Sequence, residues 1–222
     1  NPPTSSRENY LRLDFNENTV GCSPEVIDAL KKIDARSLSV YPEYNKFRKK
    51  LSRFLNVGFN QVMPTNATDE AIKTVIETYI EKGKDEVIIP VPTFAMFKFY
   101  AQLNEAIIRE IKYNPDLNFP VEKILAKINK NTKIIVLVNP NNPTGTWVDK
   151  TSLEQFLGAV PENVIVVLDE AYTEYVTEAE FPNGLDYLER YPNVVVTRTF
   201  SKAYGLAGLR VGYSISSPAV CD

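Results

Sequence analysis

The feature that most constrains the fold of this chain is a succession of short apolar runs separated by segments with helical patterns. In the strongest runs valine, isoleucine and leucine occupy consecutive positions, which is typical of parallel strands buried on both faces of a sheet. The runs fall at residues 87–89, 106–108, 134–138, 164–168, 194–196 and 211–215. They predict a doubly wound α/β fold with a mostly parallel sheet and helices on both faces.

Helical signals fill the intervals between the runs. Ser23-Pro24 predicts a helix over residues 25–33, because serine is a common N-cap and proline suits the first helical position. Residues 1–20 have few periodic apolar positions, so we expect an extended arm there. Further helices are expected at residues 44–55, 68–81, 95–103, 121–128 and 151–157.

Composition narrows the chemistry. The 222 residues carry a net charge of −3 and include no histidine, which excludes Ser-His-Asp catalysis and histidine-ligated zinc, so we expect no metal centre. A mildly acidic chain offers no strong basic field for nucleic acid or an anionic membrane. No apolar run approaches the roughly 20 residues of a spanning helix, no export signal is visible, and Cys22 and Cys221 stand far apart. We therefore expect a cytoplasmic protein with reduced thiols.

Polar residues follow three of the apolar runs at the point where each run ends. They are Asn-Pro-Asn-Asn-Pro-Thr-Gly at 139–145, Asp-Glu-Ala-Tyr at 169–172 and Thr-Arg-Thr-Phe-Ser-Lys at 197–202. Because ligands of doubly wound sheets bind beyond the carboxyl ends of the strands, these segments predict a binding site. Each segment alone has a plainer interpretation, as a turn, a helix cap or a solvated lysine. The three together are more specific than any one of them.

The chain resembles the fold-type-I aminotransferases, which use pyridoxal 5′-phosphate (PLP). The motifs that carry the resemblance are NPTG at 142–145, DEAY at 169–172 and SKAYGLAGLRVG at 201–212. Within that group the chain is most similar to the histidinol-phosphate aminotransferases, and the similarity runs from Asp14 onward. The motif around Lys202 is the most specific of the three.

The resemblance implies catalytic roles for Lys202, Asp169 and Tyr172. Lys202 would form the Schiff base with the PLP aldehyde and, once freed by the substrate, move the proton at the substrate carbon. PLP acts as an electron sink with a protonated ring nitrogen, and Asp169 would stabilise that cation by charge pairing. Asn142 and Tyr172 would both donate hydrogen bonds to the phenolic oxygen of the ring.

The resemblance also implies two sets of phosphate ligands. Ala67 and Thr68 stand where relatives place a helix N-terminus, with its free N–H groups, under the PLP phosphate. Asn66 and Asp69 have the spacing of a capping box at that turn. Related enzymes often carry glycine where Ala67 stands, and alanine has a less permissive backbone. The second set comprises two hydroxyls and a guanidinium, from Thr199, Ser201 and Arg210.

Two aromatic residues extend the resemblance. Phe94 matches the ring that stacks on PLP in relatives, although a core position would also explain it. Tyr41 matches a tyrosine that reaches the phosphate of the neighbouring subunit's cofactor, which implies a homodimer with a shared active site. We expect residues 1–40 to form an arm and helix that contribute to a small domain or to the dimer contact, and residues 41–222 to form the PLP-binding large domain. Relatives continue into a C-terminal small domain that is absent from this chain.

The resemblance predicts transamination between an amine donor, such as L-histidinol phosphate, and 2-oxoglutarate. Three alternatives use the same scaffold. The chain could belong to an enzyme like the threonine-phosphate decarboxylases, to an aromatic or other amino-acid aminotransferase, or to a non-catalytic PLP-fold module with a regulatory role. The motif residues do not separate the first two from transamination of histidinol phosphate, because reaction choice depends on which bond of the substrate stands perpendicular to the ring.

Overall fold

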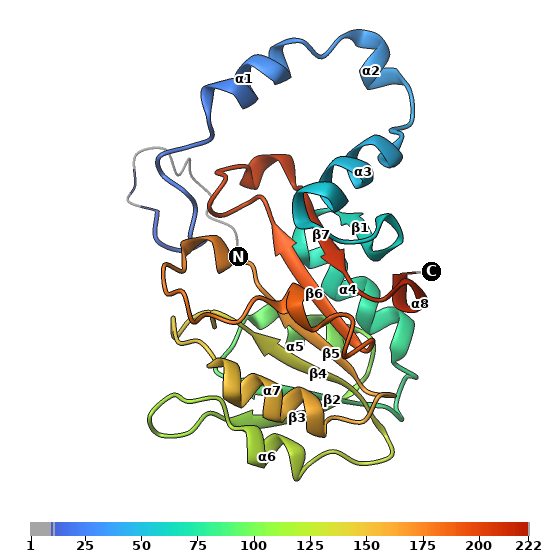
Figure 1. The fold of residues 1–222 in the computed structure, drawn as a ribbon, viewed down its shortest axis with the longest axis vertical. Helices are drawn as coiled ribbons and strands as arrows, with labels where there is room; N and C mark the ends of the chain where they lie inside the picture. The colour runs from blue at the N-terminus through green and yellow to red at the C-terminus, as the bar shows by residue number, and fades with distance from the viewer. Residues whose placement is uncertain (1–9, 11, 222) are drawn as a thin grey trace.

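A seven-stranded sheet forms the centre of the molecule in the computed structural model, which describes residue 10 and residues 12–221 (Figure 1). Its strands lie in the order β1-β7-β6-β5-β4-β2-β3. Strands β3, β2, β4, β5 and β6 are parallel, and β7 runs antiparallel to both of its neighbours. The strands are β1 (Val62–Thr65), β2 (Glu86–Val91), β3 (Ile107–Lys112), β4 (Thr132–Val138), β5 (Ile165–Asp169), β6 (Val194–Thr199) and β7 (Gly212–Ile215).

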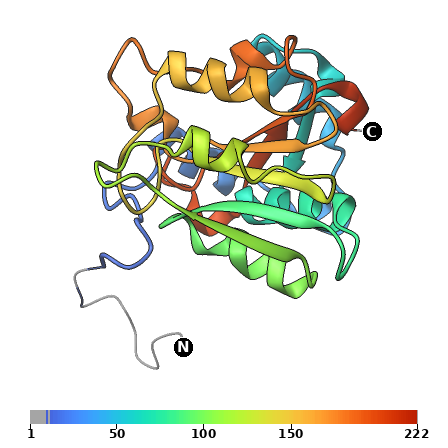
Figure 2. The ribbon, with the colours of Figure 1, turned by 90° about the horizontal axis from the view of Figure 1, so that it is seen from below.

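Helices cover both faces of this sheet. Figure 2 shows α6 and α7 on one side, and α4 and α5 on the other. The helices are α1 (Pro24–Lys31), α2 (Ala35–Ser39), α3 (Tyr44–Leu55), α4 (Ala67–Tyr79), α5 (Ala95–Leu103), α6 (Val121–Leu125), α7 (Lys150–Ala159) and α8 (Pro218–Cys221). Short 3₁₀ turns lie at η1 (Phe59–Gln61), η2 (Thr173–Tyr175), η3 (Gly184–Tyr187) and η4 (Ala207–Leu209). None of the helices in the described residues is long and apolar enough to cross a membrane.

Strand β4 shows why the central strands are apolar at every position. Ile135 and Leu137 pack with α6 and α7, whereas Ile134 and Val136 pack on the opposite face with α4 and α5. Successive side chains of a strand point to opposite faces, so a strand covered on both sides needs apolar residues throughout. The predicted doubly wound α/β class is therefore confirmed, with β7 as the antiparallel exception.

Strand β1 is the strand that the sequence did not predict. Val62-Met63-Pro64-Thr65 lies at an edge of the sheet and pairs with β7 in the register Val62↔Ile215 to Thr65↔Gly212. Proline is tolerated at a sheet edge because it has no N–H to donate to a neighbouring strand. The helix expected over 121–128 is shorter in the structure and ends at Leu125.

The N-terminal part of the described chain stands apart from the sheet. Helices α1 and α2 contain no buried residue and form an arch away from the body in Figure 1. Residues 1–9 and 11, which belong to the predicted extended arm, lie outside the described residues. Helix α3 returns the chain to the sheet, where Leu51 joins the core on the side of α6 and α7.

Candidate active site

A cavity of about 380 Å³ opens beyond the carboxyl ends of the parallel strands. The strand order reverses between β2 and β4, and ligands of such sheets bind at that switch point. Every predicted site residue except Tyr41 lines this cavity: Ala67, Thr68, Phe94, Asn142, Asp169, Tyr172, Thr199, Ser201, Lys202 and Arg210. Side chains that the sequence places far apart are thus brought to one place by the topology of the sheet.

Asp169 is the last residue of β5 and is only 2% exposed. Its Oδ1 accepts hydrogen bonds from Thr197 Oγ1 at 3.0 Å and from the Ala171 N–H at 3.2 Å. Among the described residues no lysine or arginine forms an ion pair with it. Burial raises the pKa of Asp169 to about 7, because the two hydrogen bonds offset only part of the lost hydration. The cavity therefore contains a carboxylate that would gain from a cationic ligand.

Tyr172 brings a phenol into the same cavity. Its Oη accepts from Asn16 Nδ2 at 3.0 Å and from Asn142 Nδ2 at 3.5 Å. Burial raises the pKa of Tyr172, so the phenol keeps its proton at neutral pH and remains a donor for a ligand. Asn142 and Tyr172, the two residues expected to donate to the phenolic oxygen of the cofactor, contact each other, and Asn16 also contacts Tyr172.

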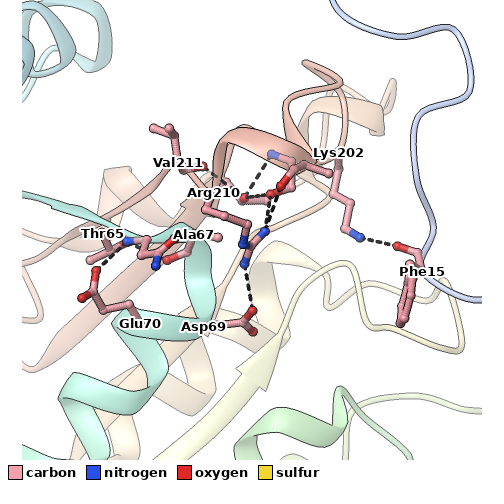
Figure 3. A network of polar contacts seen from close by, with 12 residues as sticks. Phe15, Thr65, Ala67, Asp69, Glu70, Lys202, Arg210 and Val211 are labelled. Atoms are coloured by element: carbon pink, nitrogen blue, oxygen red, sulfur yellow. Dashed lines mark hydrogen bonds and ion pairs between the residues drawn. The ribbon is translucent and has the colours of Figure 1, made fainter. Parts of the chain in front are cut away.

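Lys202 extends its amine toward the N-terminal segment, as Figure 3 shows. Its Nζ donates to the Phe15 carbonyl oxygen at 2.7 Å and lies 5.6 Å from the centre of the Tyr172 ring. Burial lowers the pKa of Lys202 and outweighs the opposing effect of the nearby carboxylates of Asp69 and Glu17. A lysine whose neutral form is favoured in this way is a better nucleophile and proton acceptor than a solvated one.

The opposite end of the cavity has the donors of an anion site. Ser201 Oγ accepts from Thr199 Oγ1 at 2.9 Å and from Arg210 Nη1 at 3.5 Å. Arg210 Nη2 also donates to Asp69 Oδ2 at 3.0 Å (Figure 3). A phosphate is a stronger acceptor for a guanidinium than a half-exposed carboxylate, so an anion bound here would compete with Asp69 for Arg210.

The turn before α4 completes the anion site. Ala67 has a φ of 58°, in the left-handed region that normally favours glycine, and its carbonyl oxygen accepts from Thr65 Oγ1 at 2.7 Å. The predicted capping box is wrong: the Asn66 side chain makes no cap, and the Asn66 N–H donates instead to Glu70 Oε2 at 2.5 Å. Asp69 is unavailable for that cap because it is paired with Arg210 (Figure 3).

Gly212 explains how the turn comes so close to the sheet. A Cβ at Gly212 would lie 2.7 Å from the Cα of Ala67, too close for any side chain. Thr65, just before the turn, is the register partner of Gly212 in the β1–β7 pair. Ala67 thus lies in the cavity wall with a left-handed backbone. The turn can come this close because Gly212, on the neighbouring strand β7, has no side chain.

A segment from Asp14 to Glu17 forms a further part of the cavity wall. Asn18 Nδ2 donates to the Ala203 carbonyl oxygen at 3.0 Å, beside Lys202. Gly205, at a φ of 67°, approaches this segment so closely that a Cβ would lie 2.6 Å from the Gly21 carbonyl. We call residues 14–22 the strap. Its polar, aperiodic sequence gives no signal of these contacts, and only the glycine of the Lys202 motif hints at a close approach.

The two aromatic predictions differ in outcome. Phe94 precedes α5, lines the cavity and packs edge-on against Phe97, with ring centres 6.5 Å apart. Tyr41 is 97% exposed and is not part of the cavity wall of its own chain. Within the described residues no three acidic or cysteine side chains gather in a way that could hold a metal ion.

Comparison with known proteins places the chain among PLP enzymes. The profile of the aminotransferase class I and II family matches residues 8–222. The chain is 42% identical over 214 residues to histidinol-phosphate aminotransferase 2 of Pseudomonas aeruginosa, covering 96% of this chain and 57% of that protein.

Two solved structures are also similar to it. The histidinol-phosphate aminotransferase of Sinorhizobium meliloti in complex with pyridoxal 5′-phosphate has a TM-score of 0.86 and 29% identity, over 93% of this chain and 56% of that one. The L-threonine-O-3-phosphate decarboxylase of Porphyromonas gingivalis has a TM-score of 0.71 and 26% identity, over 88% and 58%. The chain therefore spans between half and two thirds of the length of these relatives.

Proposed function

Because the chain belongs to the aminotransferase class I and II family, we propose that it is the cofactor-binding part of a PLP-dependent histidinol-phosphate aminotransferase. The observation that carries the proposal is the joint presence of Lys202 and Asp169 in one cavity. Lys202 is an amine with a lowered pKa, and Asp169 is a buried carboxylate that forms no ion pair with any described lysine or arginine. An amine for the aldehyde and an anion for the ring nitrogen are what PLP needs from a protein.

The residues present fit PLP at each of its polar groups. PLP supplies an electron sink that stabilises negative charge at the substrate carbon. Asp169 would hold the proton of the ring nitrogen, since its burial makes an unpaired negative charge costly and a facing cation favourable. Tyr172 and Asn142 would hold the phenolic oxygen, and their mutual contact at 3.5 Å already brings the two donors together.

Lys202 would have two roles. Its amine is the group that holds the aldehyde carbon, and after displacement by substrate it would carry the proton to and from the substrate carbon. Both roles require a neutral amine for part of the cycle, which the lowered pKa of Lys202 favours. The hydrogen bond from Lys202 Nζ to Phe15 O would have to break before Lys202 could bind the cofactor, so cofactor binding would change the contact between Lys202 and the strap.

The phosphate group would bind between the α4 N-terminus and β6. Thr199, Ser201 and Arg210 would donate from one side, and Ala67 and Thr68 from the other. Asp69 would be displaced from Arg210 by the stronger acceptor. Since Tyr41 is exposed and lies outside the cavity wall of its own chain, it is free to contribute to the phosphate site of a second copy in a homodimer.

A phosphorylated amine is the donor we propose, with 2-oxoglutarate as the acceptor. The support is the name and 42% identity of the Pseudomonas aeruginosa relative. A second candidate, decarboxylation of a threonine phosphate, is favoured by the structural similarity to the Porphyromonas gingivalis enzyme. The two reactions are separated by the product, because only decarboxylation releases CO₂ and only transamination converts 2-oxoglutarate to glutamate.

Borohydride reduction tests the site directly. The intact protein is incubated with PLP, reduced, digested and analysed by mass spectrometry. We expect a pyridoxyl label on Lys202 and none elsewhere in the cavity, and loss of the label in Lys202→Arg, which keeps the charge but does not form the imine at neutral pH. A label spread over surface lysines, with Lys202 unmodified, would contradict the proposal. Glutamate formation from 2-oxoglutarate and L-histidinol phosphate then tests the substrates.

A further inference from the structure

A second buried carboxylate follows Asp169 and points to the other face of the sheet. Glu170 is fully buried, and its Oε2 accepts from Arg198 Nε at 2.9 Å and from Arg198 Nη2 at 2.6 Å. Arg198 lies on β6 and is 8% exposed. Asp169, the last residue of β5, lines the cavity, whereas the next residue, Glu170, pairs with Arg198 and does not line it.

The Glu170–Arg198 pair also binds the far end of the loop that follows Glu170. Glu170 Oε1 accepts from the Gly184 N–H at 2.7 Å, and Arg198 Nη2 donates to Asn183 Oδ1 at 2.7 Å. Gly184 has no room for a side chain, because a Cβ would lie 2.8 Å from Glu170 Oε1. Both ends of residues 170–184 are therefore fixed to the same two side chains.

Tyr172 lies within that closed segment. The Thr173 N–H donates to the Glu170 carbonyl oxygen at 3.1 Å, so the turn that carries Tyr172 begins on the braced residue itself. The phenol then extends to the cavity and meets Asn16 and Asn142. The place of the Tyr172 Oη thus depends on a turn whose other anchor is the buried ion pair.

Stability alone does not account for this pair. A buried ion pair loses much of its attraction to desolvation, and apolar residues of the same volume often serve as well. Two bonds from Arg198 to Glu170 Oε2, together with the bonds to Asn183 and Gly184, give Glu170 and Arg198 a defined orientation that an apolar pair would lack.

We propose that Glu170 and Arg198 are positioning residues that fix the 170–184 segment and thereby hold the Tyr172 hydroxyl in the cofactor cavity. The link to PLP rests on the proposed function, but the link from the ion pair to Tyr172 does not. Glu170 and Arg198 do not line the cavity, so their effect on a ligand would pass through Tyr172.

The first measurement reads Tyr172 without any cofactor. 3-Fluorotyrosine is placed at position 172 of the intact protein, and its ¹⁹F resonance is compared between the parent and Glu170→Gln. We expect a shifted or broadened resonance, because the neutral amide faces Arg198 with a donor and releases one side of the brace. A resonance unchanged in position and width would overturn the proposal.

A matched control separates positioning from general destabilisation. Glu86 on β2 is also a buried carboxylate paired with an arginine, at 2.7 Å from Arg109 Nη2, but it lies at the other end of the sheet. Glu86→Gln should leave the Tyr172 resonance unchanged. Should Glu170→Gln fail to fold, Arg198→Lys keeps the charge and loses the fork to Glu170 and Asn183, and the same shift is expected. An unshifted Arg198→Lys would then overturn the proposal.

A second measurement follows the effect to the ligand. The Kd for PLP, from titration of the visible absorption band, should rise roughly tenfold in Glu170→Gln, a typical coupling between neighbours. The rise should vanish when Tyr172→Phe is already present. An equal rise in both backgrounds would show that Glu170 acts by another route. If the parent protein binds no PLP, the proposed function fails, while the ¹⁹F result still decides the positioning role.

Discussion

Asp169 and Glu170 are adjacent buried carboxylates that differ in how the protein compensates for their lost hydration. Glu170 is neutralised by Arg198 and bonded to the Gly184 N–H, so its negative charge is satisfied by the protein. Within the described part of the chain Asp169 accepts from a hydroxyl and a backbone N–H and has no ion pair; burial raises the pKa of both acids, to about 7 for Asp169, but at Glu170 the charge of Arg198 opposes the rise. The two environments belong to consecutive residues: Asp169 ends β5 in register with Thr197, and the next residue, Glu170, binds Arg198.

The difference teaches where a protein leaves a charge for a ligand. Two adjacent buried acids could both have been paired internally, but Asp169 has Thr197 as its side-chain partner where Glu170 has Arg198. A hydroxyl orients a carboxylate without neutralising it. The charge of Glu170 is thus compensated within the folded protein. The charge of Asp169 would be compensated when a cation is bound beside it.

The largest effect should come from removing the unsatisfied charge. In the intact protein with PLP, Asp169→Asn should lower kcat by at least roughly a thousandfold, because an amide cannot stabilise a cation at the ring nitrogen. Glutamate formation under steady-state conditions measures it. Glu86→Gln, in the distant buried pair, should retain parental turnover. Turnover of Asp169→Asn within tenfold of the parent would contradict the proposed role of Asp169 at the ring nitrogen.

The satisfied acid should matter most for folding. Glu170→Ala leaves Arg198 buried without its partner, so the free energy of unfolding should fall by about 4 kcal/mol. Urea denaturation at pH 7 measures it. Asp169→Asn serves as the reference, because it removes a carboxylate that the fold does not neutralise and should cause no comparable loss. If the free energy of unfolding fell equally in the two variants, Glu170 would contribute no more to folding than Asp169 does.

A smaller effect should appear as a pH dependence that belongs to Asp169. Its folded pKa of about 7 lies above the unfolded value, so the folded state retains a proton that the unfolded state has lost. The stabilisation is present below the unfolded pKa and is lost as pH rises through 7, in total on the order of 4 kcal/mol, of which roughly 3 kcal/mol is lost above pH 5. Without PLP, the parent protein should lose more stability between pH 5 and pH 8 than Asp169→Asn. Parallel pH profiles would contradict the assigned pKa, and saturating PLP should flatten the profile of the parent.

The sheet and the strand-end residues were predictable because their signals are local. Runs such as Ile134 to Val138 fixed the buried strands, and the polar residues after β4, β5 and β6 fixed the edge at which the cavity lies. Strand β1 was not predictable in the same way, because Pro64 interrupts a short run that pairs only with a strand far along the chain. Its assignment depends on pairing, which no local pattern contains.

The parts of the site that the sequence missed depend on long-range contacts. The strap shows no periodicity, and its role follows from contacts such as Lys202 Nζ to Phe15 O. The capping box at Asn66 failed because Arg210 binds Asp69 and leaves Glu70 to accept the backbone N–H. Glu170 stood within a recognisable motif, yet its partner Arg198 and its anchor at Gly184 become visible only when the chain is folded.

The close packing of Gly212 against Ala67 has a consequence for how ligand binding is coupled to the pairing of strands. The anion end of the cavity exists only where β7 has docked beside β1, and these strands come from opposite ends of the sheet-forming sequence. A ligand held at this end of the cavity would therefore bridge the first and the last strand of the sheet in chain order, and its binding would stabilise the pairing of β1 with β7.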